Sequence, residues 1–290
     1  MNIDYDITAK IYRKMYLDEA IHPEILHTLE NVKNKHYRYS EMTKKIRTLI
    51  AQNQDTGLTD DRPKKGSSRA LMFSKEPMEV RIDGEKTTVP YVLKVAFSGT
   101  LDKYRQHDSK LLGQLQNEHE INYGKSDYAF NWSPLRKVGE DDYVTNKAAD
   151  AFLPPIFDHD ADHNWMTVGK ITPVTADVVR SITKHSDFKK GLSIKDIHDA
   201  LVYHHDVAHG IVSAYDSRLN DLIFHPKIDS IIDFCSSTNT HPHDFAKRNL
   251  GIWQHPITKE NHLVASDAGY SEKVMNAYRS ARRAMQNNRY

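Results

Sequence analysis

A block of short β-type runs between two helical stretches most constrains the fold of this 290-residue chain. Short runs of residues that favour β-strands, RALMF, MEVRI and VPYVLKVAF, all lie within residues 69–97. Asp83-Gly84 follows the second run, and this dipeptide between alternating runs predicts a β-hairpin. An all-helical fold contains no β-strands and cannot account for this block, so the sequence predicts a mixed α+β protein.

The rest of the chain alternates between helical and strand-like patterns. Residues 101–123 predict a helix, AFLPPIF and NWMTVGKI predict two strands, and LGIW and HLVAS predict a late hairpin. A helix is expected from Ser193, because Ser193 and Asp196 have the spacing of a capping box. A further helix is expected through residues 219–234, interrupted by Pro226.

These patterns give five segments. We expect a helical N-terminal extension over residues 1–51, where hydrophobic residues recur at helical spacing, and a polar linker over 52–68. A β-rich lobe is expected over 69–172 and a helical lobe over 173–272. The last segment, 273–290, is expected to be an amphipathic helix whose basic face is solvated; the alternative is contact with an anionic partner such as nucleic acid.

Composition excludes several classes of protein. The 40 basic and 39 acidic residues nearly cancel, so no global basic field predicts a nucleic-acid partner. No apolar run approaches the roughly 18–20 residues of a spanning helix, and the first residues lack the apolar core of a secretory signal. Cys235 is the only cysteine, which excludes an internal disulfide framework and suits a reducing cytoplasm.

Three polar segments are candidates for phosphate chemistry. Lys94 lies inside the apolar run YVLKVAF, where its ammonium must either reach solvent or meet an anion. The segment HPHDFAKRN, residues 241–249, offers an acid, two cations and an amide just before a predicted strand. The segment SDAGYS, residues 266–271, places an aspartate on a turn just after a strand, which suits a metal-binding carboxylate.

Taken in this order, the three segments resemble the protein-kinase fold. Asp244-x-x-x-x-Asn249, a short hairpin and Asp267-Ala-Gly269 resemble its catalytic and metal-binding loops. GSSRALMF followed by VLKVAF resembles the phosphate-covering loop and the strand that carries the nucleotide lysine. The resemblance covers about residues 64–272 and is closest to the abbreviated kinase-like proteins encoded by tailed bacteriophages. It implies a two-lobed fold, with ATP and Mg²⁺ as cofactors and the host cytoplasm or the phage virion as location.

The resemblance assigns roles on the nucleotide side. Lys94 would hold the α- and β-phosphates, paired with Glu120 or, as the alternative, Glu118 in the segment QNEHEI. The phosphate-covering loop would be formed by Gly66, Ser67 and Ser68.

The resemblance also assigns roles on the acceptor side. Asp244 would orient or deprotonate the acceptor hydroxyl, and Lys247 or Arg248 would offset charge on the transferred phosphoryl group. Asn249 and Asp267 would ligate magnesium, which bridges the phosphates.

The chain also departs from the kinase pattern. Pro242 stands where kinases usually have a histidine, and Ala268 stands where an aromatic residue normally packs. The phosphate loop keeps one of its usual glycines, so nucleotide binding is expected to be weak. Few residues follow Gly269, so we expect a truncated C-lobe without the helical subdomain that docks peptides.

Two functions follow from the resemblance, and a third comes from a different motif. The first is ATP- and Mg²⁺-dependent phosphotransfer to a hydroxyl of a protein Ser/Thr or of a small molecule. The second is a kinase-fold protein with little or no catalysis, an adaptor among the structural proteins of a phage particle. The third is a metal phosphohydrolase of the HD class, suggested by His205-Asp206 in YHHDVAHG. At about 100° per residue, Asp206 points away from the apolar stripe, which favours core-edge histidines over a metal pair.

Overall fold

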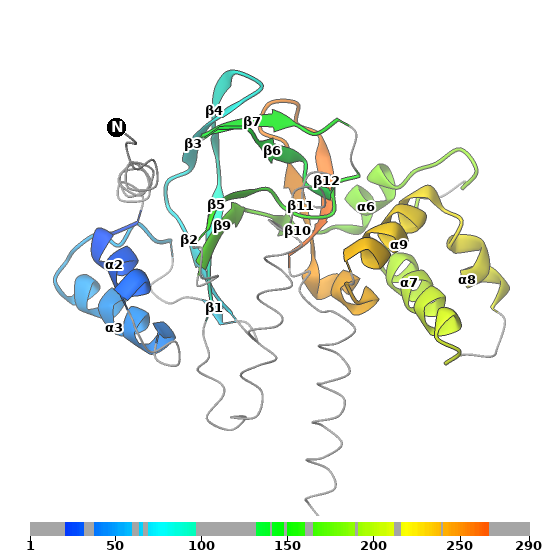
Figure 1. Cartoon of the computed structure of the whole chain (residues 1–290), viewed down its shortest axis with the longest axis horizontal. Helices are drawn as coiled ribbons and strands as arrows, with labels where there is room; N and C mark the ends of the chain where they lie inside the picture. The colour runs from blue at the N-terminus through cyan, green and yellow to red at the C-terminus, as the bar shows by residue number, and fades with distance from the viewer. Residues whose placement is uncertain are drawn as a thin grey trace, which may run out of the picture. The chain divides into compact units, whose positions relative to one another are not determined.

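The computed structural model shows a mixed α+β protein, which confirms the predicted class (Figure 1). Its described residues form helices and three β-sheets. The chain divides into two compact units, which we describe separately. The first comprises Met1–Arg81, Glu85–Leu111 and Ile156–Lys170; the second comprises Ile82–Gly84, Leu112–Pro155 and Ile171–Tyr290. The structure describes residues 21–31, 38–59, 64–65, 69–96, 132–139, 141–147, 150–159, 165–188, 191–211, 216–238 and 240–266.

Two helices of the first unit lie where the periodicity predicts them, α2 over Pro23–Asn31 and α3 over Arg38–Ala51. Ile25 on α2 and Ile46 on α3 are fully buried, and the two helices contact each other. Helix α3 ends at a left-handed residue, Asn53, with φ of 56°, after which the Gln54 N–H donates to the Leu49 carbonyl over 2.9 Å. This 6→1 bond satisfies one of the last carbonyls of the helix.

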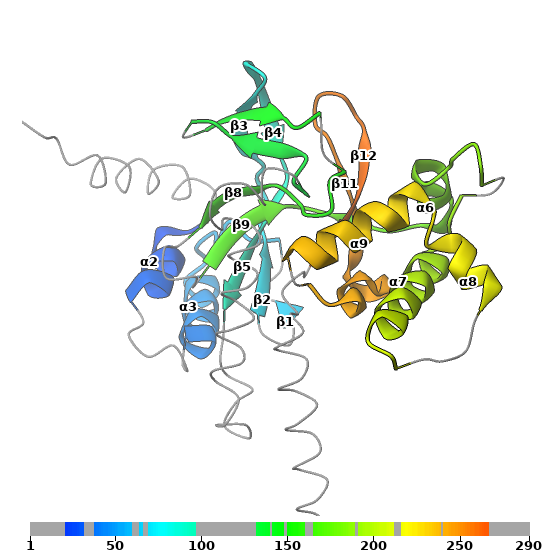
Figure 2. The same ribbon diagram turned by 45° about the vertical axis from the view of Figure 1, so that its right-hand side comes forward.

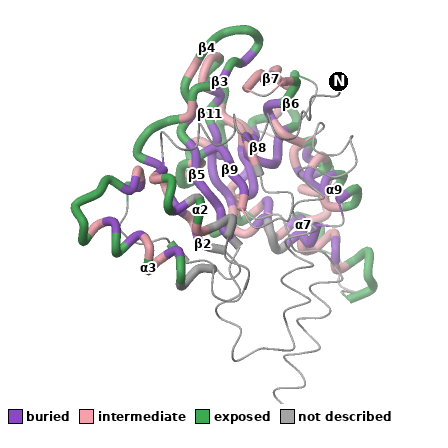
Figure 3. The backbone as a smooth tube through the Cα atoms, turned by 60° about the vertical axis from the view of Figure 1, so that its left-hand side comes forward, coloured by how far each residue is buried: buried purple, intermediate pink, exposed green. Residues whose placement is uncertain are grey.

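A five-stranded sheet forms the centre of the first unit. Its order is β1-β2-β5-β9-β8, and all neighbouring strands pair antiparallel. Strands β5 and β9 are buried along most of their length (Figure 3). The strands span Lys64–Lys65 (β1), Arg69–Phe73 (β2), Tyr91–Ala96 (β5), Trp165–Gly169 (β9) and Ile156–His159 (β8).

The predicted hairpin at Asp83-Gly84 is confirmed. Strands β3, Met78–Ile82, and β4, Glu85–Val89, flank the turn. Asp83 has φ of 52° and Gly84 has φ of 83°. Positive φ at both central residues defines a type I′ turn, whose twist matches that of the two strands. The tip of the hairpin, Ile82–Gly84, belongs to the second unit.

The prediction of a strand over AFLPPIF is wrong for its first half. Strand β8 begins only at Ile156, because the preceding Pro154 and Pro155 have no N–H to donate to a sheet. Residues 151–155 are buried instead as an irregular segment. The N–H groups of Phe152 and Leu153 donate to the Trp132 carbonyl over 2.8 and 3.0 Å, so the backbone is satisfied without a strand.

The second unit has two small antiparallel hairpins. Strands β6, Leu135–Lys137, and β7, Asp142–Thr145, pair with each other antiparallel. Strands β10, Thr172–Pro173, β11, Leu250–Gln254, and β12, Asn261–Ala265, form a third sheet in that order.

Gly251 on β11 leaves room for a close neighbour. A Cβ at this position would lie 2.5 Å from the Ile171 side chain, so β11 needs a glycine where the segment entering β10 passes.

Four helices complete the second unit, and α7 contacts both α8 and α9 (Figure 2). Helix α7 begins after Ser193 with the predicted capping box, which is confirmed: Ser193 Oγ accepts from the Asp196 N–H, and Asp196 Oδ2 accepts from the Ser193 N–H. Pro226 does not interrupt a helix but begins one, at the first position, where no N–H is needed. The helices are α6, Ala176–Ile182, α7, Ile194–Ala208, α8, Ser217–Leu222, and α9, Pro226–Thr238.

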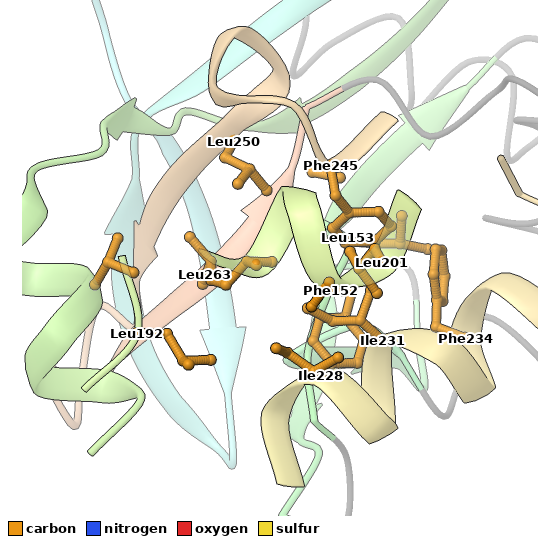
Figure 4. Close-up of a cluster of buried hydrophobic side chains, with 14 of the residues drawn as sticks. Phe152, Leu153, Leu192, Leu201, Ile228, Ile231, Phe234, Phe245, Leu250 and Leu263 are labelled. Atoms are coloured by element: carbon orange, nitrogen blue, oxygen red, sulfur yellow. The ribbon is translucent and has the colours of Figure 1, made fainter. Parts of the chain in front are cut away.

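The core of the second unit is built around an aromatic cluster (Figure 4). The rings of Phe152, Phe234 and Phe245 lie with their centroids 5.7–6.2 Å apart and meet at steep angles. Leu201 from α7 and Ile231 from α9 are buried among them. Because Phe245 belongs to the predicted catalytic segment, this core anchors that segment directly.

Candidate functional site

Lys94 lies on the central strand β5 of the first unit. Lys94 is 7% exposed. The sequence left open whether its side chain faces solvent, and the structure shows that it does not. Leu71 on β2 and Met166 on β9 are its cross-strand partners. Since directly opposed residues share a face of a sheet, the Lys94 ammonium belongs to an otherwise apolar face.

That face carries more lysines at its border. The Phe73 ring, opposite Val92, has the Lys64 Nζ 4.8 Å and the Lys170 Nζ 5.8 Å from its centroid. This face is a buried core cluster with ammonium groups at its border. The apolar residues of this face are Leu71, Phe73, Val92, Ile156, Met166 and Val168.

Several predicted residues of the nucleotide side lie outside the described residues. Gly66, Ser67 and Ser68 are among them, although the strands on either side pair with each other, Lys65 opposite Ala70. Glu118 and Glu120, the alternative predicted partners of Lys94, also lie outside the described residues, as does the predicted metal ligand Asp267.

The predicted catalytic segment forms two short 3₁₀ turns before β11. The turn η4 spans Pro242–Phe245 and η5 spans Lys247–Asn249. Asp244 lies in η4, and its side chain is outside the described part. Lys247 and Arg248 are exposed, while Phe245 is 1% exposed in the core. The buried Phe245 ring thus anchors this segment to the core, while Lys247 and Arg248 face solvent.

The β11–β12 register brings Asn249 next to Ser266, the described residue that precedes Asp267. Leu250 pairs with Ala265, so the strands separate one residue further on, at Asn249 and Ser266. The Ser266 N–H donates to the Asn249 carbonyl over 2.6 Å, and the Ser266 hydroxyl donates to the same oxygen over 3.0 Å. Asn249 therefore lies beside the residue that precedes Asp267 in the sequence.

A pocket lined by histidines lies next to this loop, in the same unit. Its volume is about 210 Å³. The periodicity of α7 predicted histidines at the edge of the core, and His205 is indeed 9% exposed. The sequence did not reveal the pocket, because His241 joins the others only through the fold. Its lining residues are Leu201, His204, His205, Ala208, His209, Ile232, Cys235, Ser236, Thr240, His241 and Pro242.

The imidazoles of this pocket contact one another. The rings of His205 and His209 stack with centroids 4.2 Å apart, and the His241 ring lies 4.6 Å from that of His205. His209 Nδ1 is 2.8 Å from the His205 carbonyl, which can only accept, so this nitrogen carries the proton. His205 Nδ1 is 3.1 Å from the Asp206 carboxylate. Burial lowers the pKa of His204, which keeps that imidazole neutral at pH 7.

A second polar network connects the end of strand β7 with two turns of this unit. The Thr145 hydroxyl donates to Asp83 Oδ2 over 2.5 Å and lies 2.9 Å from His255 Nε2. His255 Nδ1 accepts from the N–H groups of Ile257 and Thr258, both at 3.2 Å, so the ring proton is on Nε2. His255 therefore donates to Thr145 and cannot serve as its base. No sequence pattern links these residues, because they lie far apart along the chain.

Comparisons with protein-family models, with curated proteins and with solved structures find no significant match for this chain. Within the described residues, no three or more His, Cys, Asp or Glu side chains are grouped to hold a metal ion. No helix in the described ranges is long and apolar enough to cross a membrane.

Proposed function

We propose that this chain is an ATP- and Mg²⁺-dependent phosphotransferase with a kinase-like fold, acting on a hydroxyl group. The observation that carries the proposal is the neck of the β11–β12 hairpin, where the Ser266 N–H bonds to the Asn249 carbonyl. The motif Asp244-x-x-x-x-Asn249…Asp267 requires its two metal ligands to meet at one place. The neck supports this, since it holds Asn249 against the residue before Asp267.

The donor chemistry suits magnesium. Asn249 offers an amide oxygen and Asp267 a carboxylate, and oxygen ligands of this kind are those that Mg²⁺ accepts. Asn249 is half-buried at the end of a strand, so a rigid element positions it. When bound, Mg²⁺ would neutralise charge on the β- and γ-phosphates.

The protein's own residues would do the rest by positioning. Lys94, on its apolar face, would hold the α- and β-phosphates, paired with Glu120 or Glu118. Asp244 would take the proton of the acceptor hydroxyl. The exposed Lys247 or Arg248 would offset charge on the phosphoryl group as it moves.

The second proposal inherited from the resemblance is a non-catalytic adaptor in a phage particle. Pro242 favours it, because a buried proline stands where an active kinase has its loop histidine. For both proposed functions, the resemblance implies that the protein is located in the host cytoplasm or in the phage virion. The third reading, an HD hydrolase, requires an all-helical bundle, and three sheets are incompatible with that architecture.

Thermal unfolding with and without Mg·ATP separates the first two. Nucleotide at a hundredfold its Kd should add about 2.7 kcal/mol, which raises Tm by roughly 4–8 °C. Asn249→Ala and Asp267→Ala should abolish the Mg²⁺-dependent part of the shift. Asn261→Ala, at the other end of the same hairpin, is the matched control and should keep it. A folded wild-type protein without any shift at millimolar nucleotide would instead indicate the adaptor.

A further inference from the structure

The histidine-lined pocket lies between α7, α9 and the segment that leads into the candidate catalytic turn. Thr240, His241 and Pro242 line it, and the chain continues from Pro242 into η4, which contains Asp244. Helix α7 packs directly against η4. A molecule in this pocket would therefore lie against the same loop that carries the proposed proton acceptor.

The size of the pocket limits its ligand. The volume is about 210 Å³. Pockets for drug-sized ligands are larger, about 300–1,000 Å³. A molecule the size of a small sugar or polyol fits.

The lining indicates an uncharged ligand rich in hydroxyl groups. Among the described lining residues there is no Lys, Arg, Asp or Glu. His209 carries its proton on Nδ1, which leaves Nε2 as a hydrogen-bond acceptor. The Ser236 and Thr240 hydroxyls also line the space. Stacked imidazoles and the side chains of Leu201 and Ile232 match the C–H faces of such a molecule.

We propose that this pocket binds the acceptor of the reaction, a small neutral polyhydroxylated molecule rather than a protein side chain. The inference rests on the proposed phosphotransfer. One hydroxyl oxygen of the bound molecule forms a bond to the γ-phosphorus of ATP. The bond from that phosphorus to the β,γ-bridging oxygen breaks, the hydroxyl proton passes to the Asp244 carboxylate, and ADP leaves.

The proposal is tested by a substitution that fills the pocket and leaves the hydrophobic core unchanged. Ala208, the last residue of α7, lines the pocket and is exposed, so Ala208→Phe should occupy the space and still fold. The matched control is Val207→Phe, because Val207 is 48% exposed and does not line the pocket. ADP release from Mg·ATP is measured with glycerol, erythritol, ribitol or glucose as acceptor, and with dephosphorylated casein as a protein acceptor.

We expect at least one polyol or sugar to raise ADP release at least tenfold in the wild type and in Val207→Phe. Ala208→Phe should lose at least tenfold of that stimulation, while its Mg·ATP-induced Tm shift stays unchanged. Casein phosphorylation that survives Ala208→Phe overturns the proposal, and so does nucleotide binding without stimulation by any of the four small molecules. If Mg·ATP does not raise the Tm of the wild type, the phosphotransferase proposal itself is refuted. This result differs from the two outcomes above, in which the protein binds nucleotide.

Discussion

Thr145→Val tests the network that connects the end of strand β7 with two turns of the second unit. Valine keeps the shape and the methyl group of threonine and removes only the hydroxyl. Two hydrogen bonds disappear, the one donated to the Asp83 carboxylate over 2.5 Å and the one accepted from His255 Nε2 over 2.9 Å. The Thr145 N–H still donates to Asp83 Oδ1, so the β7 backbone keeps its contact with the turn.

The magnitude follows from where each partner lies. Asp83 is exposed and recovers water, so its lost bond costs about 1 kcal/mol. His255 is 1% exposed, and its Nε2–H loses the Thr145 oxygen, which costs about 1–3 kcal/mol. We therefore expect Thr145→Val to lower the free energy of unfolding by about 2–4 kcal/mol.

Urea unfolding followed by tryptophan fluorescence measures this loss, because the Trp253 ring lies 5.6 Å from the His255 ring. Thr145→Ser keeps the hydroxyl and should stay within about 1 kcal/mol of the wild type. If valine costs under about 0.5 kcal/mol, or if serine costs as much as valine, the network does not contribute as described.

Three further predictions concern single residues of the second unit. Ser193→Ala removes the capping box of α7 and should cost about 1 kcal/mol in thermal unfolding, whereas Ser193→Asp should be close to neutral. Phe245→Ala should cost about 3–5 kcal/mol and Phe245→Leu clearly less, since the ring is 1% exposed in the core; equal losses would contradict the packing. Burial lowers the pKa of His225, so the unfolded state takes up the proton first as pH falls below about 6.5. The wild-type Tm should therefore fall with pH below that value, and His225→Gln should flatten the slope; an unchanged slope would exclude His225 as its origin.

The elements predicted correctly are those encoded by short stretches of chain. Asp83-Gly84 specifies its turn through two positive φ angles, and Ser193 specifies the start of α7 through a residue three positions away. Both signals depend only on neighbours in the sequence. The late hairpin β11–β12 is equally local, and it was predicted together with the motif it carries.

What the sequence did not reveal depends on distant partners. Strands β6 and β7 are three and four residues long and polar in composition, so no alternation marks them. The burial of Lys94 follows from the central place of β5, which the order of strands along the chain does not give. The histidine pocket needs His241 to reach α7 across the fold. In each case tertiary packing, and not local propensity, decides the outcome.

The β11–β12 hairpin also bears on how the second unit folds. Its pairings join residues close in sequence, and such hairpins close in about 1–10 μs. Pairing of β10 with β11 must instead wait for the chain between Pro173 and Gly251 to close. Helices α6 to α9 are synthesised before the hairpin, so β10 cannot pair with β11 until β11 has been synthesised. The pairing near Asn249 and Ser266 can therefore close early, and β10 joins the sheet once the longer loop has closed.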